Sequence, residues 1–320
     1  MQHPLETRFQ LKIARRQPMA EGIVSFELVH PDGQALPPFT VGSHLTIQVP
    51  NGEHRKYSLC NSPEDAQHYQ ITVKREENGR GGSRSLVDDA REGDLLYAWA
   101  PDNAFELVDN AKSYLFIAGG IGITPMLSMI RSFGELPPAP WKLVYLSQRP
   151  ETTAFLDELG DATLKKQVRI HHDYGDPGKQ FDLWPLLEKP DQGHVYCCGP
   201  RGLMEAVRDM SGHWSPSRIH FESFVEGGAA QPDDKPFDVH LAQSGQTLTV
   251  PVGRSILSVL REGGHAVPSS CESGSCGSCK TRLLEGQADH RDFVLMPDEM
   301  DDHIMVCVSR AHSDTLTLDL

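Results

Sequence analysis

Four of the seven cysteines in this 320-residue chain follow a spacing that restricts what its last third can do. Cys271, Cys276 and Cys279 form a C-x4-C-x2-C run, and Cys307 follows after 27 further residues. Plant-type 2Fe-2S clusters have this pattern, with three thiolates from one loop and a distant fourth. A structural zinc site usually combines short paired cysteines, so zinc and buried free thiols are the weaker alternatives. The spacing therefore predicts a two-iron cluster with these four ligands.

Two glycines and the absence of one motif refine this prediction. Gly274 and Gly277 allow the loop to wrap closely, so that backbone amides can approach the anionic sulfurs. A Rieske centre would replace two cysteines by histidines, and the sequence contains no C-x-H pair. We therefore expect the chain to carry electrons without itself activating oxygen.

Length and composition indicate a globular protein of two or three domains. No apolar stretch approaches the roughly 18 residues of a membrane helix, and residues 1–16 lack the apolar segment of a secretory signal. We expect a soluble, cytoplasmic monomer without membrane attachment. The formal charge of −14 argues against a nucleic-acid partner, because phosphate binding needs clustered Lys and Arg.

The first hundred residues show short alternating apolar runs bounded by Pro, Gly or Asn. The runs contain Val24, Phe26 and Leu28, then Leu45, Ile47 and Val49, and then Ile71 and Val73. Several short strands with turns between them predict an antiparallel barrel or sandwich.

From about Lys112 apolar strands alternate with helical patterns. The strands cover residues 113–118, 141–146 and 194–198, and the helical repeats are Met126, Ile130 and Phe133, then Leu203, Val207 and Met210. This alternation predicts a doubly wound parallel sheet.

A small, polar and charged segment at residues 226–236 predicts an interdomain linker. A third domain follows it. Apolar alternation on both sides of Ser244-Gly245 predicts a hairpin, and Ser255 is placed to cap a helix that carries Ile256 and Leu260.

Two glycine turns predict a dinucleotide site. Residues 119–125 follow an apolar strand and open a helix, with Thr124 as the expected N-cap and Pro125 at the first helical position. Such a helix start attracts pyrophosphate, although Pro125 stands where a Rossmann fingerprint has its third glycine. Residues 196–200 repeat the strand, glycine and helix order and place Cys198 at the carboxyl edge of the sheet. A tight structural turn and a small buried cysteine are the alternatives.

Two segments of the first domain suit a flavin. Residues 55–59 supply a cation, an aromatic ring and a hydroxyl that can contact a flat ring, although an ordinary exposed strand would look the same. Residues 79–83 precede a helical stretch, and their amides and Ser83 form a possible phosphate cradle with Lys74, Arg75 or Arg80 nearby.

In chain order the motifs RKYSLCN, VKRE, GRGGS, GGIGITPM, VYCCGP, HFESF and CESGSCGSC resemble the phthalate dioxygenase reductase family, which includes vanillate O-demethylase reductases. The resemblance extends over essentially the whole chain. It implies a ferredoxin-reductase-like FMN barrel at residues 1–107 and an α/β NADH domain at 108–225. After the linker at 226–236 it implies an α+β plant-type ferredoxin domain of the β-grasp type at 237–320.

The resemblance also implies roles for individual residues. Around FMN it places Arg55, Tyr57, Ser58, Val73, Lys74, Arg75, Gly81, Gly82, Ser83, Thr124 and Phe224. Around NADH it places Gly120, Gly122, Pro125, Cys198, Gly199 and Pro200, with Asp173 as the candidate for the adenine ribose. Thr124 and Cys198 would position flavin and nicotinamide, and no acid-base residue is assigned. FAD and NADPH stay open on the residues alone, the latter because Arg149 lies in a neighbouring segment.

These cofactors together predict an activity. NADH delivers two electrons as hydride, whereas a 2Fe-2S cluster accepts one at a time, so a flavin must connect them. The resemblance implies the NADH-dependent reductase of a two-component Rieske aromatic oxygenase or demethylase. The alternatives are another acceptor, such as a ferredoxin or a different monooxygenase, and a redox sensor that does not turn over nucleotide.

Overall fold

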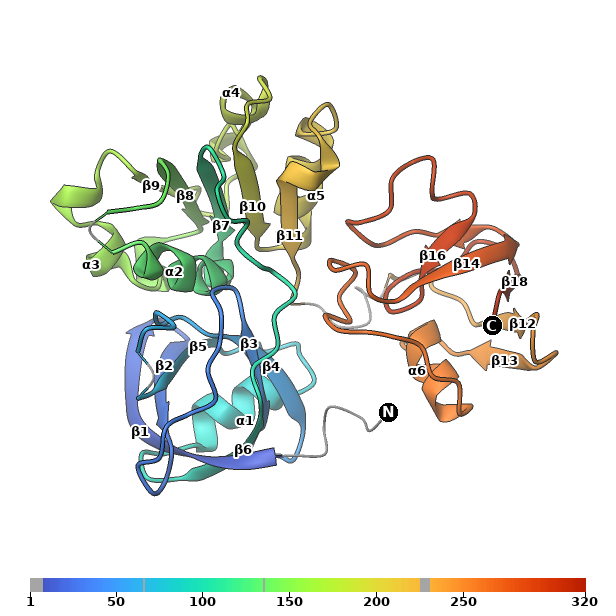
Figure 1. The fold of residues 1–320 in the computed structure, drawn as a ribbon, viewed down its shortest axis with the longest axis horizontal. Coiled ribbons are helices and arrows are strands. Elements are labelled where there is room, and N and C mark those ends of the chain that lie inside the picture. The colour runs from blue at the N-terminus through green and yellow to red at the C-terminus, as the bar shows by residue number, and fades with distance from the viewer. Residues whose placement is uncertain (1–7, 66, 135, 225–230) are drawn as a thin grey trace. The chain divides into compact units, whose positions relative to one another are not determined.

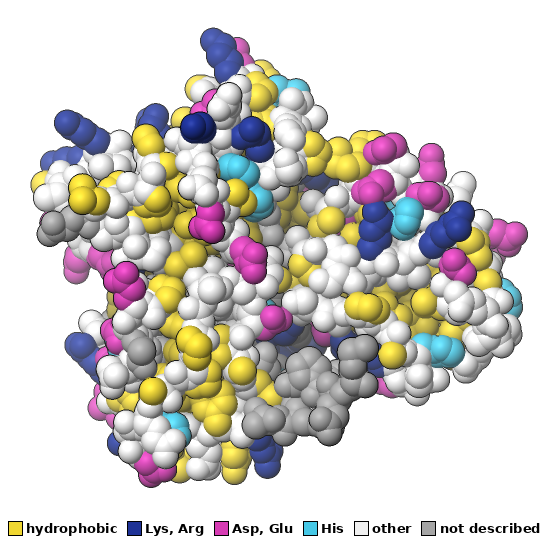
Figure 2. All heavy atoms as spheres, viewed as in Figure 1, with side chains coloured by type: hydrophobic (Ala, Val, Ile, Leu, Met, Phe, Trp, Pro, Cys, Tyr) yellow, Lys and Arg dark blue, Asp and Glu magenta, His cyan; other side chains and the backbone are white. Residues whose placement is uncertain are grey.

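The computed structural model describes residues 8–65, 67–134, 136–224 and 231–320. By its internal packing the chain divides into two compact units, residues 1–220 and 221–320. Figure 1 shows the first unit as a barrel and a parallel sheet, and the second as a smaller mixed sheet. Figure 2 shows acidic and basic side chains interspersed on the drawn face. Within the described residues, no helix combines the length and apolar character needed to cross a bilayer.

The N-terminal part is an antiparallel barrel. Its strands are β1 (Arg8–Ala20), β2 (Ile23–Val29), β3 (His44–Gln48), β4 (His54–Ser58), β5 (Tyr69–Lys74) and β6 (Leu95–Trp99), in the order β4-β3-β6-β1-β2-β5. A bridge between Leu59 and Ile71 joins the ends of that order, next to β4 and within β5. Helix α1 (Gly82–Asp89) packs on β4 and β5. Of the two architectures that the sequence allowed, the barrel is therefore the one that forms.

Strand β1 is the barrel element that the apolar pattern does not indicate. It pairs with both β2 and β6, yet only Leu11 and Ile13 of its 13 residues are buried. A register shift between Ile13 and Arg15 interrupts its alternation. A bulged strand of this kind loses the period of two that marks a strand in sequence.

The second part of unit 1 is a five-stranded sheet. Its strands are β7 (Tyr114–Gly119), β8 (Trp141–Ser147), β9 (Val168–His172), β10 (His194–Cys198) and β11 (Ile219–Glu222), in the order β11-β10-β7-β8-β9. The pairs β7-β8, β8-β9 and β10-β7 are parallel, as predicted. The helices are α2 (Ile123–Ser132), α3 (Leu156–Leu159), α4 (Trp184–Leu187) and α5 (Arg201–Met210), with 3-10 turns η1 (Gly120–Gly122), η2 (Pro150–Thr152), η3 (Ala162–Leu164), η4 (Pro177–Lys179) and η5 (Pro216–Arg218). Figure 1 shows α2 between this sheet and the barrel.

The C-terminal unit is a mixed α+β fold. Its elements are β12 (Phe237–Leu241), β13 (Thr247–Val250), α6 (Ile256–Glu262), β14 (Lys280–Glu285), β15 (Ala288–Asp289), β16 (His303–Met305), β17 (Arg310–Ala311) and β18 (Thr315–Leu318). Strand β12 pairs parallel with β18 in the sheet β13-β12-β18-β14-β16. Ser255 caps α6, since its hydroxyl accepts from the Ser258 amide at 3.1 Å, and the β12-β13 hairpin turns at Gly245. Both features were predicted.

The exact residues at which one domain ends and the next begins stay predictions. The predicted ranges are 1–107, 108–225, 226–236 and 237–320. The barrel strands end at Trp99, β7 begins at Tyr114, and β12 begins at Phe237. Residues 226–230 of the predicted linker lie outside the described part of the chain.

Asp234, in the predicted linker, is packed into the C-terminal unit by two arginines. Its carboxylate accepts from Arg291 Nη2 at 2.5 Å and lies 3.6 Å from Arg310 Nε. The side chains of Asp234 and Arg291 are each 4% exposed. Arg310 also donates to the carbonyls of Lys235 and Arg254, both at 2.8 Å. The end of the linker is therefore fixed to this unit by a buried charge network.

We expect Asp234→Ala to lower the free energy of unfolding of the C-terminal unit by about 1.5 to 3 kcal/mol, because the buried guanidinium groups of Arg291 and Arg310 lose a shared carboxylate while Arg291 keeps its pair with Asp289. The hydrogen bond from Arg291 lowers the pKa of Asp234 in the folded chain, so the stabilisation is complete above the unfolded pKa of about 3.9 and is lost as pH falls through the lowered folded pKa. Urea unfolding of the loaded chain, followed by cluster absorbance, measures the change. The matched control is Asp233→Ala at an exposed neighbour, and agreement of the two variants within about 0.5 kcal/mol would contradict the ion-pair account.

Candidate functional site

The four predicted cluster cysteines form two thiol pairs in the C-terminal unit. Cys271, Cys276 and Cys279 lie on the loop between α6 and β14, and Cys307 follows β16. Cys271 contacts Cys276, and Cys279 contacts Cys307. Among the described residues, no three side chains converge as ligands of one metal ion do. Two thiolates for each of two irons is the ligation that a 2Fe-2S cluster needs, and the pairing fits it.

Backbone amides surround the first of these sulfurs. The amides of Ser273 and Ser275 lie 3.4 Å and 3.5 Å from Cys271 Sγ. The hydrogen bond from the Cys276 thiol, together with these amides, holds the pKa of Cys271 well below its usual value. The loop is thus shaped to stabilise a thiolate, which is the form that binds iron.

Gly274 lets the loop lie against the segment that carries the fourth ligand. Its φ is +77°, and a Cβ there would be 2.7 Å from Val308 Cγ2 and 3.1 Å from Asp292 Cα. The Phe293 amide donates to the Gly274 carbonyl at 2.9 Å. A side chain at this position would separate the three-cysteine loop from the chain that follows Cys307.

The two glycine turns meet at the switch point of the parallel sheet. From β7 the chain continues to β8 and β9, and it returns to β10 on the opposite side of β7. Ala118 and Cys198 are paired at the carboxyl ends of these neighbouring strands. Open α/β sheets bind their ligands at such a point, which agrees with the site predicted from the two turns.

Glycines allow these turns to touch backbone to backbone. A Cβ on Gly122 would lie 2.2 Å from the Cys198 carbonyl oxygen, and one on Gly119 would lie 2.6 Å from Pro200 Cδ. Gly199 packs against Gly119 in the same way. The close approach leaves the start of α2 and the start of α5 side by side, where both can face a pyrophosphate group.

The helix after the first turn begins earlier than predicted. Its N-cap is Gly122 and its first residue is Ile123, so the prediction that Thr124 is the cap is wrong. The 3-10 turn Gly120–Gly122 continues directly into the helix, and the Thr124 hydroxyl donates to the Ile121 carbonyl at 3.0 Å. Pro125 is therefore the third helical residue, where its missing N–H still costs no helical hydrogen bond.

Two predicted nucleotide residues lie away from the switch point. Asp173 follows the edge strand β9, and its carboxylate accepts from the Gly175 amide at 2.8 Å. Arg149 follows β8 and lies 3.7 Å from Glu21. The ribose role of Asp173 stays a prediction.

Two other predicted nucleotide residues lie at the switch point itself. Cys198 is fully buried, and Pro200 is the N-cap of α5.

The segment predicted as a phosphate cradle, residues 79–83, leads into α1 and lies against Arg55. Gly81 precedes the helix with φ +88°, and a Cβ on Gly82 would lie 2.6 Å from Arg55 Nε. A guanidinium and a helix N-terminus at one place both favour an anion. The resemblance implied that Arg55 holds the flavin ring and ribityl chain, and this role stays a prediction.

The other predicted cations of this region already have partners. Arg75 donates to both carboxylate oxygens of Asp88, and Lys74 lies 2.7 Å from Glu76. Ser83 accepts from the Glu76 amide at 3.1 Å. Arg55 is paired as well, because its Nη2 lies 2.6 Å from Glu53 and its Nη1 donates to the His54 carbonyl at 2.7 Å. These contacts hold the loop before α1.

The remaining flavin residues differ in exposure. Val73 is buried in the barrel core, so a flavin contact there would come from its backbone. Tyr57 packs against the same core and Ser58 is buried, while Phe224 is 45% exposed. Their roles in FMN binding stay predictions.

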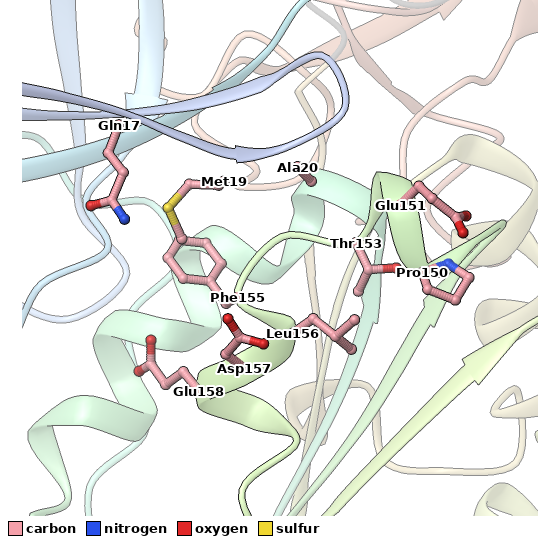
Figure 3. A pocket seen from close by; sticks show the side chains of 10 residues that line it. All are labelled: Gln17, Met19, Ala20, Pro150, Glu151, Thr153, Phe155, Leu156, Asp157 and Glu158. Atoms are coloured by element: carbon pink, nitrogen blue, oxygen red, sulfur yellow. The ribbon is translucent and has the colours of Figure 1, made fainter.

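A cavity of about 450 Å³ lies elsewhere in unit 1, between β1 and residues 150–158 (Figure 3). The lining residues are Gln17, Met19, Ala20, Pro150, Glu151, Thr153, Phe155, Leu156, Asp157 and Glu158. It contains none of the predicted cofactor residues.

Comparison with known proteins agrees with this arrangement. Residues 116–209 match the oxidoreductase NAD-binding domain family, and residues 239–312 match the 2Fe-2S iron-sulfur cluster binding domain family. The chain is 54% identical over 311 residues to the phthalate 4,5-dioxygenase oxygenase reductase subunit of Pseudomonas putida, covering 97% of this chain and 96% of that one. It is 53% identical over 323 residues to phthalate dioxygenase reductase of Burkholderia cepacia, covering 100% of both. The chain belongs to the phthalate dioxygenase reductase family.

A solved phthalate dioxygenase reductase, described as a modular structure for electron transfer from pyridine nucleotides to [2Fe-2S], matches with a TM-score of 0.76, 52% identity and full coverage of both chains. The predicted fold class and the cofactor set of FMN, NADH and 2Fe-2S are thereby confirmed. Members of the phthalate dioxygenase reductase family are NADH-dependent oxidoreductases that pass electrons through FMN and the cluster to an oxygenase. The zinc alternative for the cysteines is set aside by the match of residues 239–312.

Proposed function

We propose that this chain is the reductase component of a two-component Rieske-type aromatic oxygenase, with a phthalate dioxygenase as its first candidate partner. One observation carries the proposal. A single chain joins a glycine-lined nucleotide site at the β7-β10 switch point to a loop of paired cluster thiols. The names of the two relatives over 50% identical support an oxygenase that acts on phthalate.

The residues of the chain bind and align rather than transfer protons. The two glycine turns would hold the dinucleotide, and Arg55 with the start of α1 would hold the FMN phosphate. The amides of Ser273 and Ser275 stabilise the thiolate of Cys271. When bound, FMN supplies the conversion of two-electron to one-electron chemistry. No acid-base residue is assigned, because NADH and FMN, when bound, would supply the hydride chemistry between them.

A cytoplasmic location is part of the proposal. All seven cysteines are free thiols in the structure, and a reducing compartment keeps ligand thiols available for iron. We also propose a monomer.

The decisive experiment mixes the FMN- and cluster-loaded chain with NADH in the absence of oxygen. We expect rapid bleaching of both the flavin and the cluster absorbance, and NADH-dependent product formation when a phthalate oxygenase and phthalate are added. NADPH is the control nucleotide and should react more slowly. A flavin that stays oxidised in NADH would refute the reductase function and favour a redox sensor. Bleaching without coupling to any aromatic oxygenase would refute the proposed partner.

A further inference from the structure

Helix α2 carries a polar stripe that the nucleotide site does not account for. Thr124, Ser128 and Arg131 are spaced i, i+4 and i+7, which places them on one face of the helix. The rest of α2 is mostly apolar, and both Thr124 and Ser128 are buried. Buried polar side chains need hydrogen-bond partners, so the partners of this stripe indicate what it does.

The stripe contacts the exit of the strand that carries the predicted flavin residues. The Ser128 hydroxyl donates to the Asn61 carbonyl at 2.9 Å. Arg131 Nη1 donates to the Cys60 carbonyl at 2.9 Å and to Gln70 Oε1 at 2.6 Å. Cys60 and Asn61 follow Leu59 just after β4, and Gln70 belongs to β5. Helix α2 is therefore hydrogen-bonded to the barrel at the end of β4, the strand that carries the predicted flavin residues.

Arg131 is also fixed on its other side. Its Nε and Nη2 donate to the two carboxylate oxygens of Glu158 at 2.9 Å and 2.6 Å, and its guanidinium lies 5.4 Å from the Phe155 ring centre. The arginine side chain is 24% exposed. This bidentate geometry holds the guanidinium in one orientation. The Arg131 guanidinium that contacts the barrel is therefore held in a fixed orientation by Glu158.

Beside this contact, the space between barrel and sheet is not filled by side chains. Phe155 and Glu158 line the cavity of Figure 3, which opens next to them toward β1. Met19, Ala20 and Phe155 line this cavity and also pack with the core between barrel and sheet. Packing is incomplete beside them, so the hydrogen bonds of α2 add a directional constraint to the alignment there.

We propose that Ser128 and Arg131 are positioning residues for hydride transfer. The N-terminus of α2 follows the glycine turn at the nucleotide site, and its later residues hold the end of β4. The helix thereby sets the distance between nicotinamide and flavin. Reactions of this kind lose about 100-fold when the reacting groups are displaced by ~1 Å. The inference rests on the proposed function, since it assigns a role within the NADH-to-FMN step.

The test uses Ser128→Ala, Arg131→Lys and the double variant in the loaded chain. Lysine keeps the charge but cannot make the forked contacts. Anaerobic stopped-flow mixing with NADH, and with NADH deuterated at the transferred position, gives the flavin reduction rate at saturation, the Kd of NADH and the isotope effect. We expect the double variant to reduce flavin roughly tenfold more slowly, with Kd changed less than about threefold and an undiminished isotope effect. FMN content should stay at the wild-type value, while the unfolding midpoint should fall because buried hydrogen bonds are lost.

The controls are Ser132→Ala on the same helix, whose hydroxyl donates to the Met129 carbonyl within the helix, and Arg208→Lys on the exposed side of α5. Both should react at the wild-type rate. A saturating rate within about twofold of wild type in the double variant, or a loss that merely follows lost FMN, would overturn the positioning role. If the wild-type chain itself fails to reduce its flavin with NADH, the proposed function fails instead, and the two results are thus distinguishable.

Discussion

Replacing Cys307 by serine is expected to abolish NADH-driven electron delivery to cytochrome c or to an oxygenase while the flavin is still reduced. Cys307 is buried and pairs with Cys279, so its loss leaves one iron with a single sulfur ligand from the chain. The flavin barrel belongs to the other unit and keeps all of its contacts. Visible absorption and electron paramagnetic resonance would report the missing cluster, and stopped-flow mixing would report the surviving flavin step.

Cys197→Ala is the matched control. Cys197 is as deeply buried as Cys307 but lies on β10, within the parallel sheet. It should keep the full cluster spectrum and electron delivery. A Cys307→Ser chain that retained the cluster spectrum and one-electron delivery would refute the four-thiolate site.

Gly122→Ala is expected to reduce the rate of flavin reduction by NADH by about 100-fold. The new Cβ would lie 2.2 Å from the Cys198 carbonyl oxygen and 2.5 Å from its carbon. Both atoms belong to the backbone, so one of the two turns must move by about 1 Å, and displacement on that scale costs about two orders of magnitude in rate. The rate at saturating NADH and the FMN content measure the effect. FMN content should not change, because the residues predicted to surround its ribityl chain and phosphate lie at the end of β5 and the start of α1.

Gly202→Ala provides the comparison for this variant. Gly202 lies in α5 beside the same site, and a Cβ there meets no atom within 4 Å. It should react like the wild-type chain. If both alanine variants reduced their flavin at the same rate, the contact between the two turns would have no part in nucleotide binding.

The 2Fe-2S domain was predictable from the sequence because cluster binding depends on residue type and spacing. Cys271, Cys276 and Cys279 are close in the chain, and Cys307 follows at the distance that plant-type clusters show. The parallel sheet was predictable for a similar reason, since its buried strands and their helices are continuous patterns. Features that depend on neighbouring residues in the chain, such as the cluster loop and the buried strands, can therefore be predicted from the sequence.

Long-range contacts were not predictable in this way. Arg131 meets the Cys60 carbonyl across 71 residues, and Ser128 meets the Asn61 carbonyl across 67. Backbone carbonyls leave no signal in sequence, so the stripe on α2 resembles ordinary helix polarity. The N-cap of α2 was misplaced for a related reason, because a 3-10 turn before a helix has no residue signature of its own.

The burial of Asp234 determines where the cluster module can be cut from the rest of the chain. An excised fragment that began at Phe237, the first residue of its first strand, would leave Arg291 and Arg310 without their shared carboxylate. A fragment beginning at Gln231 would retain that carboxylate and the Gln231 amide that donates to it at 3.1 Å. For grafting this module onto another flavin reductase, the natural joint is upstream of Gln231, several residues before regular structure begins.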